Sequence, residues 1–171
     1  MRSSISIVIP TLGHKHINKT LESIFNNSYK PHEVIIAIPK NYIQKNLIKE
    51  KFKQLKKVKF IITPSKGQVY QRIYGFKNAI GDYVLQLDDD VQLDKHCLKN
   101  LILGMVKLRN VALSPTWIDK RQLGSSFDQI PKNLFFKLYH FILNGVDGYV
   151  EGTVSKAGVP YATEPSNLKK E

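Results

Sequence analysis

Three consecutive aspartates, Asp88, Asp89 and Asp90, are the residues of this chain best suited to chemistry. They directly follow the apolar run 83–87, which has the pattern of a buried strand. Neighbouring carboxylates about 4 Å apart repel each other by roughly 4 kcal/mol at an effective dielectric of 20. A protein tolerates such a cluster most easily where a hard cation such as Mg²⁺ or Mn²⁺, or a hydroxyl-rich ligand, takes up the charge. The alternative is a solvated acidic turn that caps the following helix.

A glycine and an arginine lie upstream, at the expected start of a helix over 68–79. Gly67 would let backbone N–H groups face an anion, and Arg72 would reach the same region. The alternative is a surface arginine on a helix whose entry loop contains a glycine. Neither G-x-G-x-x-G nor G-x-x-x-x-G-K-[ST] follows the first apolar run, so dinucleotide-binding and P-loop sites lose their main support.

Strand-like and helix-like patterns alternate along the first 110 residues and would position these groups. Short β-branched runs predict four strands, and amphipathic spacing predicts a helix after each. The predicted strands are 5–9, 34–38, 58–62 and 83–87, and the predicted helices are 16–25, 41–57, 68–79 and 94–109. This order predicts an α/β fold with an open, mostly parallel sheet covered by helices on both faces. Ligands bind beyond the carboxyl ends of such strands, where the aspartates lie.

The apolar spacing also predicts which helix faces are buried. Helix 68–79 is expected to bury Val69, Ile73 and Phe76, and the lysine-rich helix 41–57 an apolar stripe that includes Leu47 and Phe52. Beyond residue 110 the pattern weakens to a short fifth strand at 111–113 and an apolar helix at 134–143. That helix is expected to cover the core, although a lipid or subunit contact is the alternative.

Charge is distributed unevenly along the 171 residues. The formal net charge is +12, and residues 1–81, with 15 basic and 3 acidic side chains, account for all of it. Eight of the lysines lie between Lys40 and Lys59, which indicates either an anionic membrane surface or a solvated helix face. Nucleic acid is disfavoured because only two arginines, Arg2 and Arg72, occur in this basic half.

The composition is that of an ordinary globular protein, with 42% hydrophobic and 23% charged residues, which argues against disorder. The only cysteine, Cys97, permits no internal disulfide. No apolar run approaches the ~18 residues of a membrane span. We therefore expect a single-domain cytoplasmic protein. If the lysines between Lys40 and Lys59 face an anionic membrane, the protein would also contact the inner face of that membrane peripherally.

Three stretches together resemble the nucleotide-binding half of a family 2 glycosyltransferase of GT-A fold. The resemblance covers roughly residues 3–110, and its most specific part runs from Gly67 to the aspartates. The stretches are SISIVIPTLGH, PHEVIIAIP and GQVYQRIYGFKNAIGDYVLQLDDDVQLDKHCLKNLI. The resemblance implies that residues 1–110 form the nucleotide-sugar-binding half, and that 111–171 form part of the acceptor side and a C-terminal tail of the same domain.

The resemblance also implies roles for individual residues. Pro10 and Thr11 match the loop around the nucleotide base, and Arg72 matches a position near the base and diphosphate. Asp88 and Asp90 match the two carboxylates of the D-x-D element, which bind the ribose and the Mn²⁺ or Mg²⁺ ion, and Asp89 lies between them as a further nucleotide contact. The resemblance implies inverting transfer of a sugar from a nucleotide-diphosphate sugar to a saccharide or lipid-linked acceptor. The donor that it favours is a UDP-sugar.

Two departures from the family pattern bear on this activity. The second strand ends in Ile38-Pro39-Lys40, where the family commonly has an acidic pair that recognises the base, and Glu33 lies at the other end of that strand. The family also supplies its catalytic base from a downstream Glu-Asp pair, which Asp147, Glu151 and Glu164 do not match. The catalytic base is therefore unassigned, and we expect the chain to be a fragment of a longer enzyme. The alternatives are a non-catalytic nucleotide-sugar or nucleic-acid binding module and a sugar-phosphate nucleotidyltransferase.

Overall fold

The computed structural model describes residues 3–108 and, beyond them, residues 112, 113, 115, 118, 119, 124, 125, 134, 135 and 138. The chain divides into two compact units, Met1–Leu113 and Ser114–Glu171. Among the described residues of the second unit, β5 (Ile118–Asp119) and β6 (Gly124–Ser125) form an antiparallel pair. Among all the described residues, no helix has the length and apolar character needed to cross a membrane.

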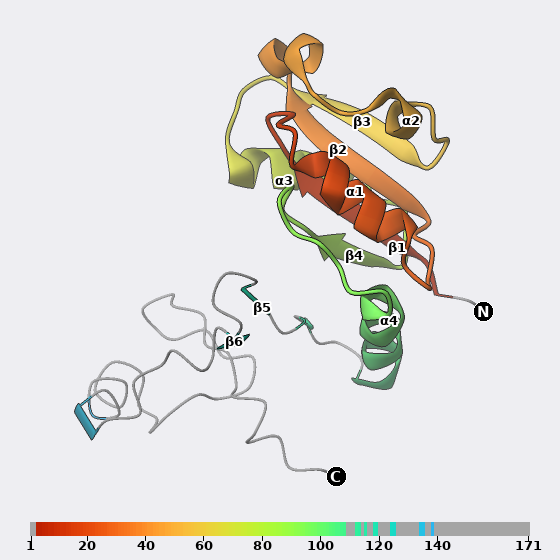
Figure 1. Cartoon of the computed structure of the whole chain (residues 1–171), viewed down its shortest axis with the longest axis vertical. Helices are drawn as coiled ribbons and strands as arrows, with labels where there is room; N and C mark the ends of the chain where they lie inside the picture. Colours follow the sequence, from red (N-terminus) through yellow and green to blue (C-terminus); the bar gives the residue numbers. More distant parts are fainter. Residues whose placement is uncertain are drawn as a thin grey trace. The chain divides into compact units, whose positions relative to one another are not determined.

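A four-stranded, all-parallel sheet forms the centre of the first unit (Figure 1). Its strands are β1 (Ile5–Pro10), β2 (Glu33–Pro39), β3 (Val58–Thr63) and β4 (Tyr83–Gln86), in the order β3-β2-β1-β4. All four coincide with predicted strands to within one or two residues. The predicted fold class, an open parallel α/β sheet, is confirmed.

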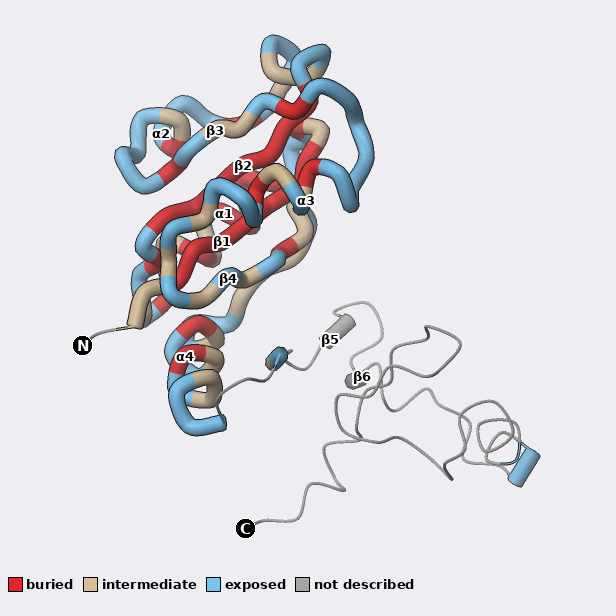
Figure 2. The backbone as a smooth tube through the Cα atoms, turned by 180° about the vertical axis from the view of Figure 1, so that it is seen from behind, coloured by how far each residue is buried: buried red, intermediate tan, exposed pale blue. Residues whose placement is uncertain are grey.

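The two central strands are buried along their whole length, which Figure 2 shows as continuous red. Isoleucine and valine occupy most of these positions, as expected for strands covered on both faces. The largest fully buried side chains include Ile7, Ile9, Ile35 and Ile36, and burial of each contributes about 1.5–3 kcal/mol. These strands therefore form a rigid base for the loops that leave their carboxyl ends.

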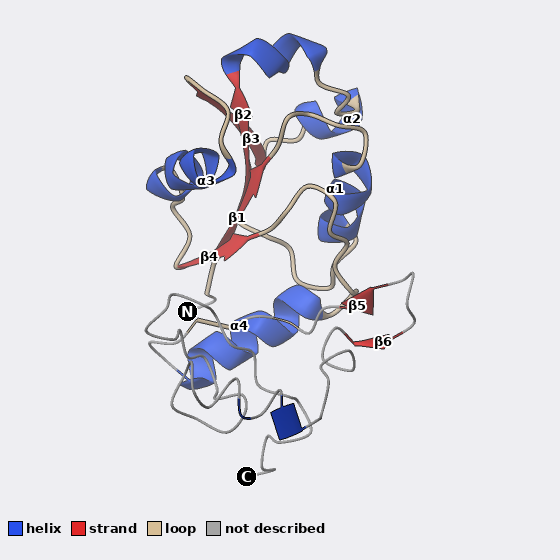
Figure 3. Cartoon of the chain, turned by 90° about the vertical axis from the view of Figure 1, so that its left-hand side faces the viewer, coloured by secondary structure: helices blue, strands red, loops and turns tan. Residues whose placement is uncertain are grey.

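Helices cover both faces of the sheet, as Figure 3 shows with the sheet seen edge-on. One face is covered by α1 (Ile17–Phe25) and α2 (Glu50–Lys53), and α4 (Cys97–Leu108) adds Leu98 and Ile102 to the same hydrophobic cluster. The other face is covered by α3 (Gln68–Lys77), which contacts the first three strands.

The predicted buried face of α3 is wrong. Val69, Ile73 and Phe76 are 68%, 44% and 42% exposed, whereas the buried residues of the helix are Gln71 and Gly75. Gly75 allows close contact with β1, because a Cβ atom there would lie 2.2 Å from Val8 Cγ1. Direct backbone packing and a buried amide thus decide the orientation of the helix, in place of its apolar stripe.

The single helix predicted over 41–57 is also wrong, because the structure divides it into a 3₁₀ helix, η1 (Lys40–Lys45), and the short α2. The segment between them is bound to the loop after β1 and to the first turn of α1. Leu47 N–H donates to the Gly13 carbonyl (2.7 Å), and the Asn18 amide donates to Leu47 O (2.8 Å) and accepts from Lys49 N–H (2.8 Å). These long-range bonds take up backbone groups that a continuous helix would use internally. Leu47 is exposed as a result, while Phe52 is buried as predicted.

Beyond α4 the sequence predictions are tested only in part. Ala112 and Leu113 are not in a strand, so the predicted fifth strand at 111–113 is wrong for these two residues, and Val111 lies outside the described residues. Leu134, Phe135 and Leu138 are helical, but they are exposed and so do not cover a core. The remainder of the predicted helix at 134–143 lies outside the described residues.

Candidate functional site

The predicted site residues meet where β1 and β4 end side by side. Val8 is paired with Gln86 in the parallel register, and Leu87 N–H donates to Val8 O (3.0 Å). The segment after β4, which contains Asp88–Asp90, is therefore placed beside Pro10, the last residue of β1, and Thr11, the first residue of the following loop. Residues 78 positions apart in the chain become neighbours in this way.

Arg72 and Asp88 form an ion pair across this edge, with Nη2 2.6 Å from Oδ1. Arg72 lies in the second turn of α3, so the helix carries its guanidinium to the end of β4. Gln68, in the first turn, donates to the same oxygen (3.3 Å). The Arg72 side chain is 19% exposed, and its Nε is buried without a hydrogen-bond partner among the described residues. The arginine therefore keeps N–H groups that could donate hydrogen bonds to an additional anion.

Asp89 has a different environment, because its carboxylate is bound within the protein. The Thr11 hydroxyl donates to Asp89 Oδ2 and itself accepts the Gly13 N–H (2.9 Å). The Thr20 hydroxyl, on α1, donates to the Asp89 backbone carbonyl (2.8 Å). Thr11 and Asp89 thus connect the loops after β1 and β4, and Gly13, with a φ of +81°, provides the turn between β1 and α1.

Gln71 is a residue of this site that the sequence did not indicate. Its side chain is buried, and its amide nitrogen donates to Thr11 O (2.9 Å) and Ala37 O (2.6 Å). Its oxygen accepts the N–H of Gly67 (3.4 Å). One side chain therefore joins the start of α3 to the ends of β1 and β2. A glutamine at a buried helix position, directly before Arg72, is the signal that could have identified it.

Asp90 is exposed, and its carboxylate makes no hydrogen bond or ion pair with the described residues. The second carboxylate oxygen of Asp88, Oδ2, also has no partner among them, because Arg72 and Gln68 both bind Oδ1. These carboxylate oxygens are free, hard ligands of the kind that Mg²⁺ and Mn²⁺ prefer. Among the described residues no group of three or more His, Cys, Asp or Glu side chains could hold a metal ion. The available donors fit an ion that shares its coordination shell with a diphosphate.

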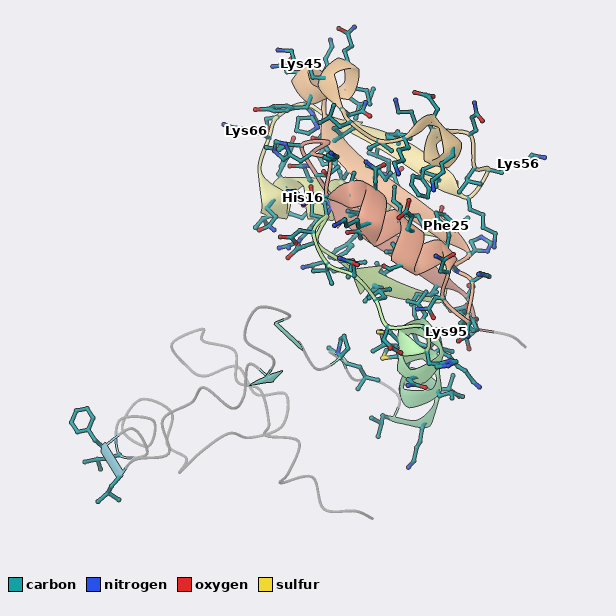
Figure 4. All side chains as sticks on the ribbon, in the orientation of Figure 1. His16, Phe25, Lys45, Lys56, Lys66 and Lys95 are labelled. Carbon is teal, nitrogen blue, oxygen red and sulfur yellow. The ribbon has the colours of Figure 1, made fainter. Side chains whose placement is uncertain are left out.

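Basic side chains surround the same edge of the sheet. Figure 4 shows Lys45, Lys66 and His16 near the carboxyl ends of the central strands, whereas Lys56 lies toward the other end. Lys40, exposed directly after β2, occupies the position at which the family pattern has an acidic pair. The carboxylates at this edge therefore lie among positive charges that would attract an anionic ligand.

Glu33 is the first residue of β2 and lies at the opposite, amino end of the sheet. Its buried carboxylate accepts from the Ser6 hydroxyl (2.7 Å) and the Ile80 N–H (2.9 Å). Lys59 Nζ lies 2.7 Å from the other oxygen and forms an ion pair with it. Burial raises the pKa of Glu33, but the Lys59 ammonium and the two donors outweigh it and leave the pKa below its ordinary value. Glu33 is a structural carboxylate, as its distance along the strand from the site implies.

Cys97, at the start of α4, is not suited to nucleophilic chemistry. It is partly buried, and desolvation together with the nearby Asp94 raises the pKa of its thiol. A raised pKa leaves less of the reactive thiolate at neutral pH. Asp147, Glu151 and Glu164, the late acidic residues that do not match the family's catalytic base, lie outside the described residues.

The sequence of residues 6–164 matches the family model described as glycosyl transferase family 2. The chain belongs to glycosyl transferase family 2. The match extends beyond the 3–110 region in which the resemblance was seen, and it includes residues of both compact units. No curated protein matches this family 2 chain.

Solved structures similar to this family 2 chain include three of the S. aureus protein TarS. TarS 1–349 has 19% identity and a TM-score of 0.51 over 66% of this chain and 39% of that one. TarS 1–349 in complex with UDP-GlcNAc has 20% identity and a TM-score of 0.52, over 66% and 37%. A longer TarS structure has 18% identity and a TM-score of 0.51, over 68% and 24%. The family 2 chain thus spans less than two fifths of each TarS chain, and the likeness establishes the shared fold.

Proposed function

We propose that this family 2 chain binds a nucleoside-diphosphate sugar and contributes to transfer of its sugar to a saccharide or lipid-linked acceptor. The observation that carries the proposal is the cluster at the carboxyl edge, where Arg72, Asp88 and Asp90 meet the Thr11 loop. This is the place where open parallel sheets bind ligands. Two of the similar TarS structures are complexes with UDP-GlcNAc and with UDP, which supports a UDP-sugar as the first donor to test.

The free oxygens of Asp90 and Asp88 would hold Mg²⁺ or Mn²⁺ together with the donor diphosphate. A bound ion supplies Lewis-acid neutralisation of the departing nucleoside diphosphate. Arg72 Nε and its second terminal nitrogen would donate to a phosphate oxygen, while the Asp88 ion pair fixes the guanidinium. Asp89, bound to Thr11 and Thr20, would orient the loop after β1, and Pro10 and Thr11 would then contact the base.

Inversion at the sugar carbon is the stereochemistry that we propose, because it follows from a single direct displacement. The acceptor hydroxyl would be deprotonated by a carboxylate as it attacks, and the leaving diphosphate would depart on the opposite side. The described residues beside Asp88–Asp90 are bound to each other or are needed for the donor. We therefore place the base outside the residues that form this cluster.

Thermal unfolding with UDP and Mn²⁺ tests the donor site. A ligand present at a hundred times its Kd stabilises the folded protein by about 2.7 kcal/mol. For a chain of this size this shifts the unfolding midpoint by about 5–10 °C. Asp90→Asn is expected to reduce the shift, whereas Glu50→Gln, which removes an exposed carboxylate on α2, is expected to leave it unchanged.

An unchanged midpoint of the wild-type protein, or equal shifts in Asp90→Asn and Glu50→Gln, would contradict the assignment. Transfer itself is tested with a panel of nucleotide sugars, with and without metal. Release of nucleoside diphosphate that depends on both acceptor and metal is the expected result. Binding without any turnover would favour the alternative of a non-catalytic nucleotide-sugar module.

A further inference from the structure

The lysines between residues 30 and 59 divide into two groups according to their partners. Those of the first group pair with the three acids of the basic half, in the ion pairs Lys49–Glu22, Lys51–Glu22, Lys53–Glu50 and Lys59–Glu33. The second group, which forms no ion pair with any described carboxylate, consists of Lys30, Lys40, Lys45, Lys56 and Lys57. The excess positive charge is therefore concentrated at particular places on the surface.

Three lysines of the second group, Lys30, Lys56 and Lys57, border two adjoining hollows at the amino end of the sheet. An apolar hollow of about 360 Å³ is formed by Phe25 and Leu55 together with Lys30, Lys56 and Lys57. A second hollow of about 300 Å³, with mixed polar and apolar lining, adjoins the first because both are lined by Lys30 and Lys57. Its other lining residues are Ser3, Ser4, Tyr29, Pro31 and His32. An apolar hollow next to one of mixed lining, with two lysines shared between them, matches an amphiphilic anion.

Hydrogen bonds hold two of these lysines in place without neutralising them. Lys30 Nζ donates to the Phe25 carbonyl, and Lys57 Nζ donates to the Pro31 carbonyl (2.8 Å). Since a carbonyl is uncharged, both ammonium groups keep their positive charge and two further N–H donors each. One negative charge lies near the second hollow, because Asp82 accepts from the Ser4 N–H and hydroxyl (both 2.7 Å). The local balance is still three lysines against one carboxylate.

We propose that these two hollows, the lysine-bordered pair, dock the protein onto a bilayer that contains anionic phospholipid. A headgroup phosphate would lie between Lys30 and Lys57, close to Lys56, and the apolar part of the lipid interface would contact Leu55, which is 37% exposed. Nucleic acid fits less well, because the lining contains no arginine and its floor is apolar. The proposal goes beyond the proposed transfer activity and does not depend on it.

The docking surface and the carboxylate cluster lie at opposite ends of the sheet. Lys57 directly precedes β3 and Lys30 lies three residues before β2, whereas Asp88–Asp90 follow the end of β4. In Figure 4, Lys56 and Phe25 lie far along the sheet from Lys45 and Lys66. A protein docked in this way would keep its carboxyl edge open to a water-soluble donor.

Sedimentation of the full chain with vesicles tests the proposal. The vesicles are phosphatidylcholine alone or phosphatidylcholine with one part in three of phosphatidylglycerol. The test variant is Lys30→Gln/Lys56→Gln/Lys57→Gln, and the matched control is Lys77→Gln/Lys99→Gln/Lys107→Gln, which removes the same charge from exposed lysines of α3 and α4. Each lysine near an anionic surface contributes about fivefold to binding, so the test variant should bind about one hundredfold more weakly. The control is expected to lose less than about fivefold.

Leu55→Ser tests the apolar contribution separately and is expected to weaken vesicle binding while the lysines remain. Circular dichroism shows whether each variant is folded, and UDP binding should be the same in wild type and in all three variants. The proposal is overturned if the wild-type chain does not sediment with the acidic vesicles, or if the two triple variants lose binding equally. It is also overturned if only duplex DNA binding depends on Lys30, Lys56 and Lys57.

Discussion

Two ion pairs of equal length, one with a buried glutamate and one with an exposed glutamate, allow a test of how much the buried carboxylate stabilises the fold. Glu33–Lys59 and Glu50–Lys53 both have N–O distances of 2.7 Å. The glutamate side chain is 2% exposed in the first pair and 73% exposed in the second. Glu33→Gln and Glu50→Gln therefore remove the same charge from the same kind of pair in two environments.

The expected loss for Glu33→Gln is about 2–3 kcal/mol in the free energy of unfolding. Removing one partner of a fully buried pair costs about 3–5 kcal/mol, but the Lys59 side chain is 50% exposed and can return to water. The bonds from Ser6 and Ile80 each weaken by about 1 kcal/mol when the acceptor becomes neutral. Glu50→Gln should cost less than about 0.5 kcal/mol, as is usual for an exposed pair.

The dependence on pH gives the experiment its second readout. The pKa of Glu33 is below its ordinary value of 4.5 in the folded protein. Its contribution to stability is therefore complete above about pH 5 and is lost as the pH falls through the folded-state pKa. The difference between wild type and Glu33→Gln should be constant near neutral pH and should shrink below pH 4.5.

Urea unfolding at a series of pH values measures both quantities. The reasoning is refuted if Glu33→Gln loses no more stability than Glu50→Gln at neutral pH. It is also refuted if the difference between wild type and Glu33→Gln stays the same down to strongly acidic pH, since it would then not arise from the carboxylate charge.

Further predictions concern α3. Gly75→Ala should destabilise the protein by about 1–3 kcal/mol in urea unfolding, because the new Cβ would lie 2.2 Å from Val8 Cγ1. Adding Val8→Ala to this variant should recover part of the lost stability. Gln71→Leu should cost about 2–3 kcal/mol, since it leaves the buried Thr11 carbonyl without this donor while Ala37 O keeps the Thr11 N–H. It should also reduce the thermal shift caused by UDP and Mn²⁺. An unchanged unfolding free energy in either variant would contradict the close packing described for this helix.

The strands were predictable because their signal is local. Runs such as Ile5–Ile9 and Val34–Ile38 combine β-branched residues with proline boundaries, and the structure places both in the buried centre of the sheet. The aspartates after the fourth run could then be placed at the carboxyl edge by topology alone. The sequence predicted that Arg72 and Asp88 lie in the same region, but it did not predict the ion pair between them.

Features that depend on distant partners were not predictable from the sequence. The orientation of α3 follows from contacts of Gly75 and Gln71 with β1 and β2, which outweigh the apolar stripe of the helix. The interruption between η1 and α2 follows from bonds to Gly13 and Asn18, more than 25 residues earlier in the chain. Residues 109–171 have weak periodicity, and no local pattern there indicates a catalytic base.

The turn between α3 and β4 has a consequence for where the chain can change in length. Gly81 N–H donates to the Ser6 hydroxyl (2.9 Å), which itself donates to Glu33, so this turn is bound to both central strands. One added residue here would move the following aspartates by about 3.3 Å along β1 and reverse the faces of β4. An insertion in the exposed η1 segment would leave the carboxylates where they are. The spacing from Gly81 to Asp88 is therefore a fixed length of this protein, whereas η1, which has no buried residue, can vary in length.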